Sequence, residues 1–457
     1  MARRRTEAFD DFVSMPLPSE KEEVWRYTPI DRLDLDRYRP VGATAPAAAA
    51  GEHRLADAFV DGVAADLSER SALVVVSNGS VVALRPGASA GPTAGGLPPG
   101  VTVGGLTGAG SGADVMAAGR DLLGTVLDGG DALVRLNDAL LTDAVVIDVA
   151  AGTVLDAPVV VVHWCDGAEP QGDSAPASFP RTLCHVGSGA RAAVVEVVAG
   201  ASGDARALVV PVSELVVDDG ARLDHVVLQV LGSGSWHLAR TAARVGRDGS
   251  LRSFSTGLGG AYDRHRTDAA IVGQGGSTQL RTAYFGAGDQ VHDIRTLQDH
   301  EAPHTTSDLL CKGAVAGSSR SVYSGLIRVR RGAVRTEAMQ TNHNLVLDER
   351  AHADSVPNLD IEENDVRCSH ASTVGPVDED QRYYLESRGV RPERAERLIV
   401  LGFFDDIVQR APVPSAVRRL RREVGTRLAG ALGIDDDLVA TAGSDDLELE
   451  ASGERRG

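Results

Sequence analysis

Asp219-Gly220-Ala221-Arg222-Leu223 is one copy of a loose repeat on which the whole architecture rests. Related stretches stand at Ser188-Gly189-Ala190-Arg191, Asp248-Gly249-Ser250-Leu251 and Gly275-Gly276-Ser277-Thr278. The glycines of the four copies, Gly189, Gly220, Gly249 and Gly276, are 31, 29 and 27 residues apart. Each copy follows a valine-rich run and precedes another run of alternating character. A near-regular repeat of strand, glycine turn and strand predicts a solenoid, because each coil buries its inner face only by stacking on the next.

The rival interpretation of this repeat is a β-sandwich, whose turn signals also recur along the chain. Apolar runs such as Val159-Val160-Val161-Val162 are too continuous for hairpin strands that expose every second residue. We therefore predict a mainly β protein, with a right-handed parallel β-helix core flanked by N-terminal and C-terminal helical parts.

Composition agrees with an elongated, soluble protein. The chain has 457 residues, more than one compact core usually holds, and it is rich in glycine (51 residues) and poor in aromatic residues (4%). The net charge of −18, from 46 basic and 64 acidic residues, opposes nucleic-acid binding. There is no run of 18 apolar residues and no signal peptide at the start, so we expect no membrane association and a cytoplasmic location.

Changes in pattern along the chain predict four regions. After Pro376 the pattern turns helical, with Asp378 as a plausible N-cap and Gly389 closing the first helix. Further helices are expected from Pro392 to Arg410 and from Ser415 to Leu432. The regions are an N-terminal helical or mixed region with flexible Gly/Ala/Pro-rich linkers (1–139), the β-helix core (140–376), a C-terminal helical domain (377–433) and an acidic disordered tail (434–457).

The residues that draw attention for chemistry are Cys368 and His370. They are two apart in a predicted strand, so both side chains leave the same face, where a thiolate and an imidazole can ligate iron or zinc. Two ligands make only half a site, and the spacing alone favours a buried cysteine beside a hydrogen-bonded histidine over a metal site. The four cysteines lie far apart with no C-x-x-C motif, which argues against a disulfide framework and against a self-contained cluster site.

One stretch imitates a protease motif. His300-Glu301-Ala302-Pro303-His304 matches the H-E-x-x-H pattern, which binds zinc only when both histidines share a helical face. Pro303 would cost a helix about 3 kcal/mol and the flanks have strand character. We therefore predict that these histidines are polar groups at the edge of a coil.

A longer set of motifs resembles a known family. In chain order the motifs, which lie between about 290 and 410, are Gln340-Thr341-Asn342-His343-Asn344-Leu345-Val346-Leu347, Ala351, Pro357-Asn358-Leu359-Asp360-Ile361, Cys368-Ser369-His370, Asp378-Glu379-Asp380-Gln381, Tyr384-Leu385 and Ser387-Arg388-Gly389. In order and spacing they resemble the C-terminal core of the SufB/SufD family of iron–sulfur cluster assembly proteins. Asn342, Ser369 and Ala371 place the chain on the SufD side, because a SufB-type chain has a cysteine at the first position and carboxylates at the other two.

The resemblance implies the β-helix fold and a role as the SufD-like scaffold subunit of a SUF-type assembly complex. It implies a SufB-like paralogue that pairs with the last strands and a SufC-like ABC-type ATPase that docks on the C-terminal helices; a homodimer is an alternative assembly. ATP hydrolysis would fall to the partner, since no phosphate-binding G-x-x-x-x-G-K-[ST] loop exists and the chain itself is not expected to be an enzyme.

The same resemblance assigns site residues. Cys368 and His370 would be cluster ligands shared with the paralogue, and Asn342 and Asn344 would lie at the partner interface. On the second C-terminal helix an apolar stripe suggests the ATPase-docking residues, which are Leu398, Phe403 and Ile407. We expect no cofactor bound stably to the chain alone, only a transient iron–sulfur cluster or iron shared with the partner.

The alternative from another functional class is a β-helical enzyme acting on polysaccharide. Such enzymes set carboxylates and aromatic sugar platforms along a groove. The chain has only three tryptophans, and none of them lies in the repeat pattern.

Overall fold

The structure is a computed structural model that describes residues 1–41, 50–87, 97–127, 130–166, 174–200 and 203–432. The predicted acidic tail (434–457) lies outside the described residues, as do residues 42–49 and 88–96 of the N-terminal region with its predicted linkers.

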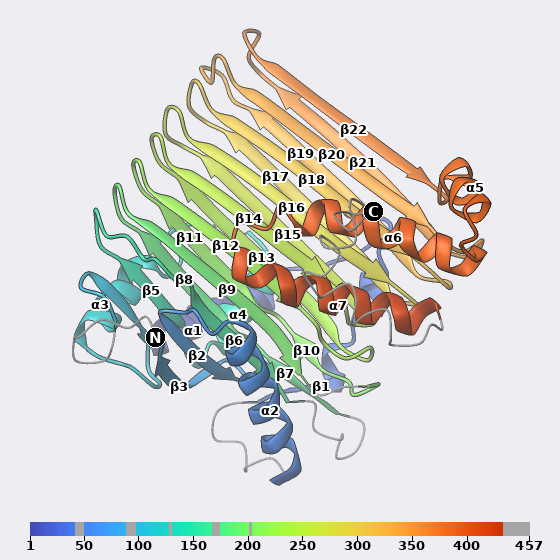
Figure 1. The fold of residues 1–457 in the computed structure, drawn as a ribbon. Helices are drawn as coiled ribbons and strands as arrows, with labels where there is room; N and C mark the ends of the chain where they lie inside the picture. Colours follow the sequence, from blue (N-terminus) through green and yellow to red (C-terminus); the bar gives the residue numbers. More distant parts are fainter. Residues whose placement is uncertain (42–49, 88–96, 128–129, 167–173, 201–202, 433–457) are drawn as a thin grey trace, which may run out of the picture.

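Two long sheets face each other and form a parallel β-solenoid, as predicted (Figure 1). The first sheet runs in the order β21-β19-β17-β15-β13-β11-β8-β5-β4, and the second in the order β22-β20-β18-β16-β14-β12-β9-β6-β2-β3. From β11 to β22, odd-numbered strands lie in the first sheet and even-numbered strands in the second, so each coil there contributes one strand to each sheet. From β5 and β6 onward, every pairing along these two paths is parallel, which rules out the β-sandwich alternative.

The strands of the first sheet are β4 (Val101–Gly105), β5 (Val145–Val149), β8 (Arg181–Val186), β11 (Val212–Val217), β13 (Trp236–Val245), β15 (Tyr262–Ile271), β17 (Val291–His300), β19 (Arg320–Val329) and β21 (His352–Ile361), with β1 (Tyr38–Pro40), β7 (Ala175–Ser178) and β10 (Leu208–Val209) attached beside them. Those of the second sheet are β2 (Ala72–Ser77), β3 (Ser80–Pro86), β6 (Val159–Cys165), β9 (Arg191–Gly200), β12 (Arg222–Gln229), β14 (Ser250–Gly257), β16 (Ser277–Gly286), β18 (Thr306–Val315), β20 (Glu337–Val346) and β22 (Arg367–Gly375). The α-helices are α1 (Ala2–Ser14), α2 (Ala50–Asp66), α3 (Ala113–Leu122), α4 (Ala132–Leu140), α5 (Glu379–Ser387), α6 (Pro392–Val408) and α7 (Pro414–Leu432), and 3-10 turns lie at Glu23–Trp25, Ile30–Arg32 and Leu35–Arg37.

The sequence repeat marks the start of successive strands in the second sheet. β9, β12, β14 and β16 each begin one or two residues after the repeat glycine. At the first two turns the glycine itself adopts the left-handed backbone, with φ of 69° at Gly189 and 66° at Gly220. At the third turn Asp248 takes this conformation instead, with φ of 53°. A short polar side chain tolerates that region, so the repeat survives without its glycine at the turn position.

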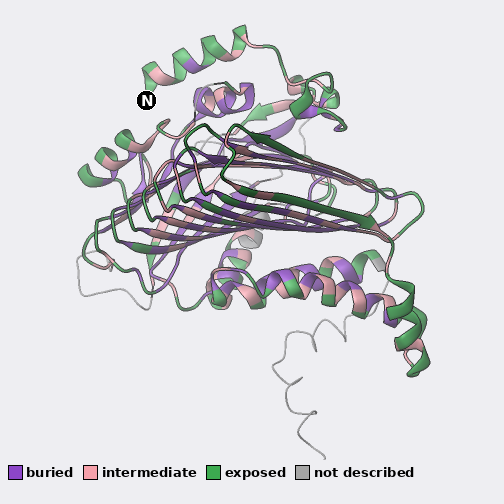
Figure 2. Cartoon of the chain, turned by 90° about the horizontal axis from the view of Figure 1, so that it is seen from above, coloured by how far each residue is buried: buried purple, intermediate pink, exposed green. Residues whose placement is uncertain are grey.

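The two ends of the solenoid differ. At the N-terminal end, β3 pairs antiparallel with β2 and β4 pairs antiparallel with β5, so each sheet ends in a reversed strand. At the C-terminal end, β21 and β22 are the last strands of their sheets, and in the described chain each pairs with one neighbour only. Many of their residues are exposed, and Figure 2 colours such residues green. One end of the solenoid is therefore capped and the other is open.

Helices cover the outer faces of both sheets. A large apolar cluster joins α2, α6 and α7 to the outer side of the second sheet, where it includes Val400, Phe404 and Leu420 from the helices. A smaller cluster packs the N-terminal segment and α4 on the first sheet through Trp25, Ile30 and other residues. Because both faces of the strands are covered, the run Val159–Val162 is buried at every position, which explains its continuous apolar sequence.

The C-terminal helices begin where the sequence predicts. The side chain of Asp378 accepts hydrogen bonds from the backbone N–H groups of Asp380 and Gln381 and so caps α5, and Gly389 follows the helix with φ of 87°. α6 starts at Pro392. No helix in the described part of the chain is both long and apolar enough to span a membrane.

The H-E-x-x-H stretch is not a zinc helix. His300 is the last residue of strand β17, and His304 stands in a turn with φ of 59°. The buried ring of His300 is hydrogen-bonded to the hydroxyls of Thr305 and Ser307, at 2.8 Å each, which holds the turn to the next strand. The prediction of polar groups at a coil edge is confirmed.

Candidate functional site

The candidate site lies at the open end of the solenoid, on strand β22. Cys368 pairs in register with Ala338 of β20, and His370 pairs with Gln340. The Gln340 side chain is buried inside the solenoid, where it reaches the carbonyl oxygen of Gly325 on the opposite sheet at 3.4 Å. Residues paired across parallel strands share a face, so His370 and Cys368 both lie on the inner face of the sheet, as their spacing predicts. His370 is nevertheless exposed, because no further coil covers it.

Cys368 is the better sheltered of the two. It packs on a small apolar cluster that includes Ile327 and Val329, while the other three cysteines of the chain are fully buried. Burial raises the pKa of its thiol, although a backbone hydrogen bond at Ala338 acts in the opposite direction. An incoming soft metal would therefore displace a proton from this sulfur before binding it. Cys368 also lines an open groove of about 530 Å³ across the starts of β16, β18, β20 and β22.

The predicted interface residues Asn342 and Asn344 require correction. Both are buried in the solenoid interior and neither reaches the surface of the described chain. The amide of Asn344 donates to the Asn342 side-chain oxygen at 2.7 Å, and that oxygen also accepts from the Ser355 hydroxyl at 2.8 Å. Ser372 of the exposed last strand donates in turn to Ser355 at 2.7 Å. The asparagines thus support the end coils from within, one coil below the exposed strands.

The prediction that the apolar stripe on α6 docks the ATPase also requires correction. Ile407 is fully buried against the outer face of the second sheet, so it is not available to a partner. Phe403 is partly covered and packs on the same cluster, with the ammonium of Lys312 4.6 Å from its ring centroid. Leu398 is 42% exposed and remains a surface residue. Most of the apolar stripe on this helix packs against the second sheet of the same chain, and only its exposed part can contact a partner.

A buried polar cluster inside the middle coils escaped the sequence analysis. Asp263 of β15 lies among three histidines: Nδ1 of His237 is 2.7 Å from its Oδ1, Nε2 of His265 is 3.1 Å from the same oxygen, and Nδ1 of His292 is 3.1 Å from its Oδ2. Glu196 of β9 has a similar environment and lies between His163 and His225. Ring nitrogens of these histidines are 2.9 and 2.8 Å from its two oxygens. All of these side chains are buried.

These surroundings shift the pKa values of the cluster. Burial opposes ionisation of Asp263, but the histidines around it outweigh burial and hold its pKa well below the usual range. The hydrogen bonds from His163 and His225 similarly lower the pKa of Glu196 against the effect of burial. Burial lowers the pKa of His237, partly offset by Asp263. Two carboxylate charges are therefore kept inside the solenoid.

The sequence contains a signal for this cluster, because its polar residues recur at about the spacing of the repeat. His237, Asp263 and His292 are register partners on β13, β15 and β17, and they are 26 and 29 residues apart in the sequence. Polar residues recurring at the coil period within strands face one another inside a solenoid. The strand boundaries have to be known within one residue before this signal can be read.

Comparison with family models gives two adjacent matches. Residues 169–403 match the model described as "SUF system FeS cluster assembly, SufBD core domain", and residues 1–161 match the "SufBD protein N-terminal region". The core match covers the coils of the middle and C-terminal part of the solenoid, the open end and most of α6.

Curated relatives agree with these matches. An iron–sulfur cluster assembly SufBD family protein of Mycobacterium tuberculosis is 39% identical over 215 residues, which are 45% of this chain and 54% of the relative. The iron–sulfur cluster assembly protein SufD of Escherichia coli is 28% identical over 300 residues, 66% of this chain and 70% of the relative. SufD of Bacillus subtilis is 32% identical over 213 residues, 46% and 48% of the two chains. The chain thus spans about half the length of the mycobacterial relative.

Proposed function

The chain belongs to the SufBD family of iron–sulfur cluster assembly proteins, and from this premise we propose that it is the SufD-like scaffold subunit of a SUF-type assembly complex. Its partners are a SufB-like paralogue at the open end of the solenoid and a SufC-like ABC-type ATPase on the C-terminal helices. The chain itself does not catalyse a reaction. The observation that carries this proposal is the open end, where Cys368 and His370 stand beside two unpaired strand edges. The family membership gives no support to a polysaccharide-acting enzyme.

The open end supports pairing with a second solenoid. β21 and β22 are ten and nine residues long, and each offers one row of backbone N–H and C=O groups without a strand partner in the described chain. Apolar side chains are also exposed there, namely Leu359, Ile361 and Val374. Soluble proteins normally shield long strand edges, because open edges recruit other strands. A paralogue built from the same coils would continue both sheets and cover these residues.

The ligands at this end suit iron but do not complete a site. A thiolate and an imidazole are donors that iron accepts, and clusters are usually held by four protein ligands. Cys368 and His370 supply two of these, so the paralogue has to bring the others across the interface. Assembly of the two chains and formation of the cluster are coupled in this arrangement. The cluster is then the product under assembly, passed on rather than retained.

The C-terminal helices offer a surface for the ATPase. No residue of α5 is buried, and Tyr383 and Tyr384 on it are among the most exposed aromatic residues of the described chain. Leu398 on α6 is exposed as well. Exposed tyrosines are typical anchors of protein interfaces, and an exposed leucine beside them adds apolar surface. We place the docking surface on α5 and the exposed side of α6, in place of the buried stripe.

Co-purification tests this proposal. A tagged chain co-expressed with a SufB-like and a SufC-like protein from the same source should recover both partners. Leu398→Asp should lower recovery of the ATPase about tenfold without changing the thermal midpoint of the chain, because the side chain is exposed and a charge in an interface is poorly tolerated. The matched control is Leu359→Asp on β21, a residue with 37% exposure, which should lower recovery of the paralogue instead. Full recovery of the ATPase with Leu398→Asp would place its docking surface elsewhere.

A further inference from the structure

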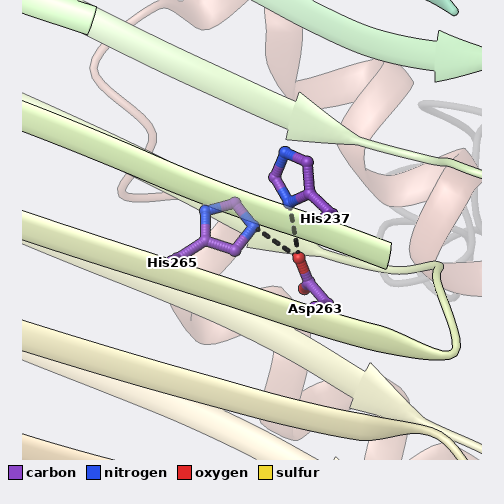
Figure 3. Close-up of side chains that lie close together, drawn as sticks. All are labelled: His237, Asp263 and His265. Carbon is purple, nitrogen blue, oxygen red and sulfur yellow. Dashed lines mark hydrogen bonds and ion pairs between the residues drawn. The ribbon is translucent and has the colours of Figure 1, made fainter. Parts of the chain in front are cut away.

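A compact set of metal-binding atoms lies inside the solenoid, away from the open end. His237, Asp263 and His265 each offer one donor atom, and the three atoms lie within 4.8 Å of one another (Figure 3). All three residues are buried, and they come from the neighbouring strands β13 and β15. The centroids of the two imidazole rings are 4.9 Å apart, the ring planes are tilted by 55°, and the Asp263 carboxylate lies beside both rings. The donor atoms are therefore already gathered before anything binds.

A cavity adjoins this cluster, and it is lined by polar atoms without partners. Its volume is about 20 Å³, and its walls include His163, Glu196, His237 and His265. Nδ1 of His163 and Nε2 of His237 are buried and have no hydrogen-bond partner among the described residues, and Nε2 of His265 makes only its 3.1 Å contact with Asp263. Native interiors rarely leave such atoms unsatisfied unless a water or an ion fills the space. The cavity has room for one such particle.

The charges of the interior favour a cation over a water. Asp263 and Glu196 are two buried carboxylates that contact histidines and no arginine or lysine in the described chain. Arg240 and Arg266, which also line the cavity, each form an ion pair with Asp268. Buried charge is normally balanced by a partner charge or a metal. A doubly charged ion would balance the two carboxylates and leave the histidines neutral, the form in which they act as ligands.

We propose that His237, Asp263 and His265 bind one divalent first-row transition ion, iron(II) or zinc(II), inside the solenoid. Two imidazole nitrogens and one carboxylate oxygen form a mixed donor set that suits these borderline ions and suits calcium or magnesium poorly. His292, 3.1 Å from the second oxygen of Asp263, orients the carboxylate from the next coil. Glu196 and His163 also line the cavity. The site contains no sulfur donor and is separate from Cys368 and His370.

Cobalt(II) is the probe for the test, because it replaces iron or zinc and absorbs in the visible range. The full chain is expressed in minimal medium containing cobalt, purified, and measured for metal per chain and for its absorption spectrum. We expect about one cobalt per folded chain, and a spectrum with d–d bands and without a thiolate charge-transfer band. His237→Asn and His265→Asn should each reduce bound cobalt at least tenfold. Metal analysis of chain from ordinary medium then distinguishes iron from zinc.

Two control variants keep the result specific. His185→Asn removes a partly buried histidine on the outer face that also contacts two carboxylates, Asp148 and Asp218, and it should retain the cobalt. His370→Asn, at the open end, should retain it as well. If an interior variant does not fold, the wild-type spectrum decides, since binding at Cys368 would show the thiolate band. A folded wild-type chain without metal, a thiolate band, or loss of cobalt only in His370→Asn would each overturn the proposal.

Discussion

A chain carrying His370→Ala is expected to assemble with its partners normally and yet to support about a tenth or less of the wild-type cluster per complex. The imidazole is exposed at the end of the solenoid, so its removal should cost the fold about 1 kcal/mol at most. In the proposed complex the same ring would supply one of few cluster ligands. Even the loss of a residue that only supports a metal ligand weakens metal binding about 10- to 100-fold. Iron and acid-labile sulfide per assembled complex, beside a melting curve, measure both effects.

Leu345→Asp is the matched control in the neighbouring strand. Leu345 packs against the apolar cluster beneath the C-terminal helices, so a charge there should lower the thermal midpoint and reduce the yield of complex. The iron content of each complex that does form should stay normal. A purely structural role for His370 predicts this same pattern for His370→Ala, with assembly lost and iron per intact complex unchanged. That result would remove His370 from the shared site.

Phe404→Ala is expected to have the largest effect on stability, a loss of about 3 to 5 kcal/mol in the free energy of unfolding. Phe404 is 1% exposed at the centre of the contact between α6 and the second sheet. Its ring meets Phe285 edge-on, with centroids 6.3 Å apart and an interplanar angle of 78°. Truncation leaves a cavity between helix and sheet that neither rigid element can close. Chemical denaturation followed by circular dichroism measures the change.

Leu398→Ala on the same helix is the control for Phe404→Ala. Leu398 is exposed in the chain alone, so its truncation should change the free energy of unfolding by no more than about 0.5 kcal/mol. Both substitutions shorten an apolar side chain in α6 and differ mainly in burial. Equal effects of the two variants would show that α6 does not rest on the solenoid in solution.

The solenoid could be predicted because its signals are local. Repeat turns such as the one at Gly220 recur at a nearly regular period, and the strand after each turn begins within two residues of the repeat glycine. The continuous apolar run Val159–Val162 indicated in addition that both faces of the strand are covered, as in a parallel core. The starts of the C-terminal helices could be predicted as well, since the cap at Asp378 and the proline at 392 each mark a helix start through contacts within one helical turn.

Long-range packing accounts for the errors. An apolar stripe shows that a helix packs against another surface, but the stripe does not show whether that surface belongs to the same chain or to a partner. Ile407 packs against the second sheet of the same chain. Asn342 belongs to the motifs that resemble the family, but its burial depends on packing against the facing sheet, where its contact Ser355 lies 13 residues away in the chain. The contact of His237 with Asp263 likewise exists only once the coils stack in register.

The central claim is that this chain completes a cluster site only together with a paralogue. Anaerobic purification of the chain alone and of its complex with SufB-like and SufC-like partners, followed by measurement of iron and acid-labile sulfide per chain, tests it most directly. Sulfide distinguishes a cluster from a single ion held inside the solenoid. We predict no sulfide and no cluster absorption for the chain alone, since Cys368 and His370 are two ligands where four are usual, and both signals for the complex. A stoichiometric iron–sulfur cluster on the chain alone would contradict the account.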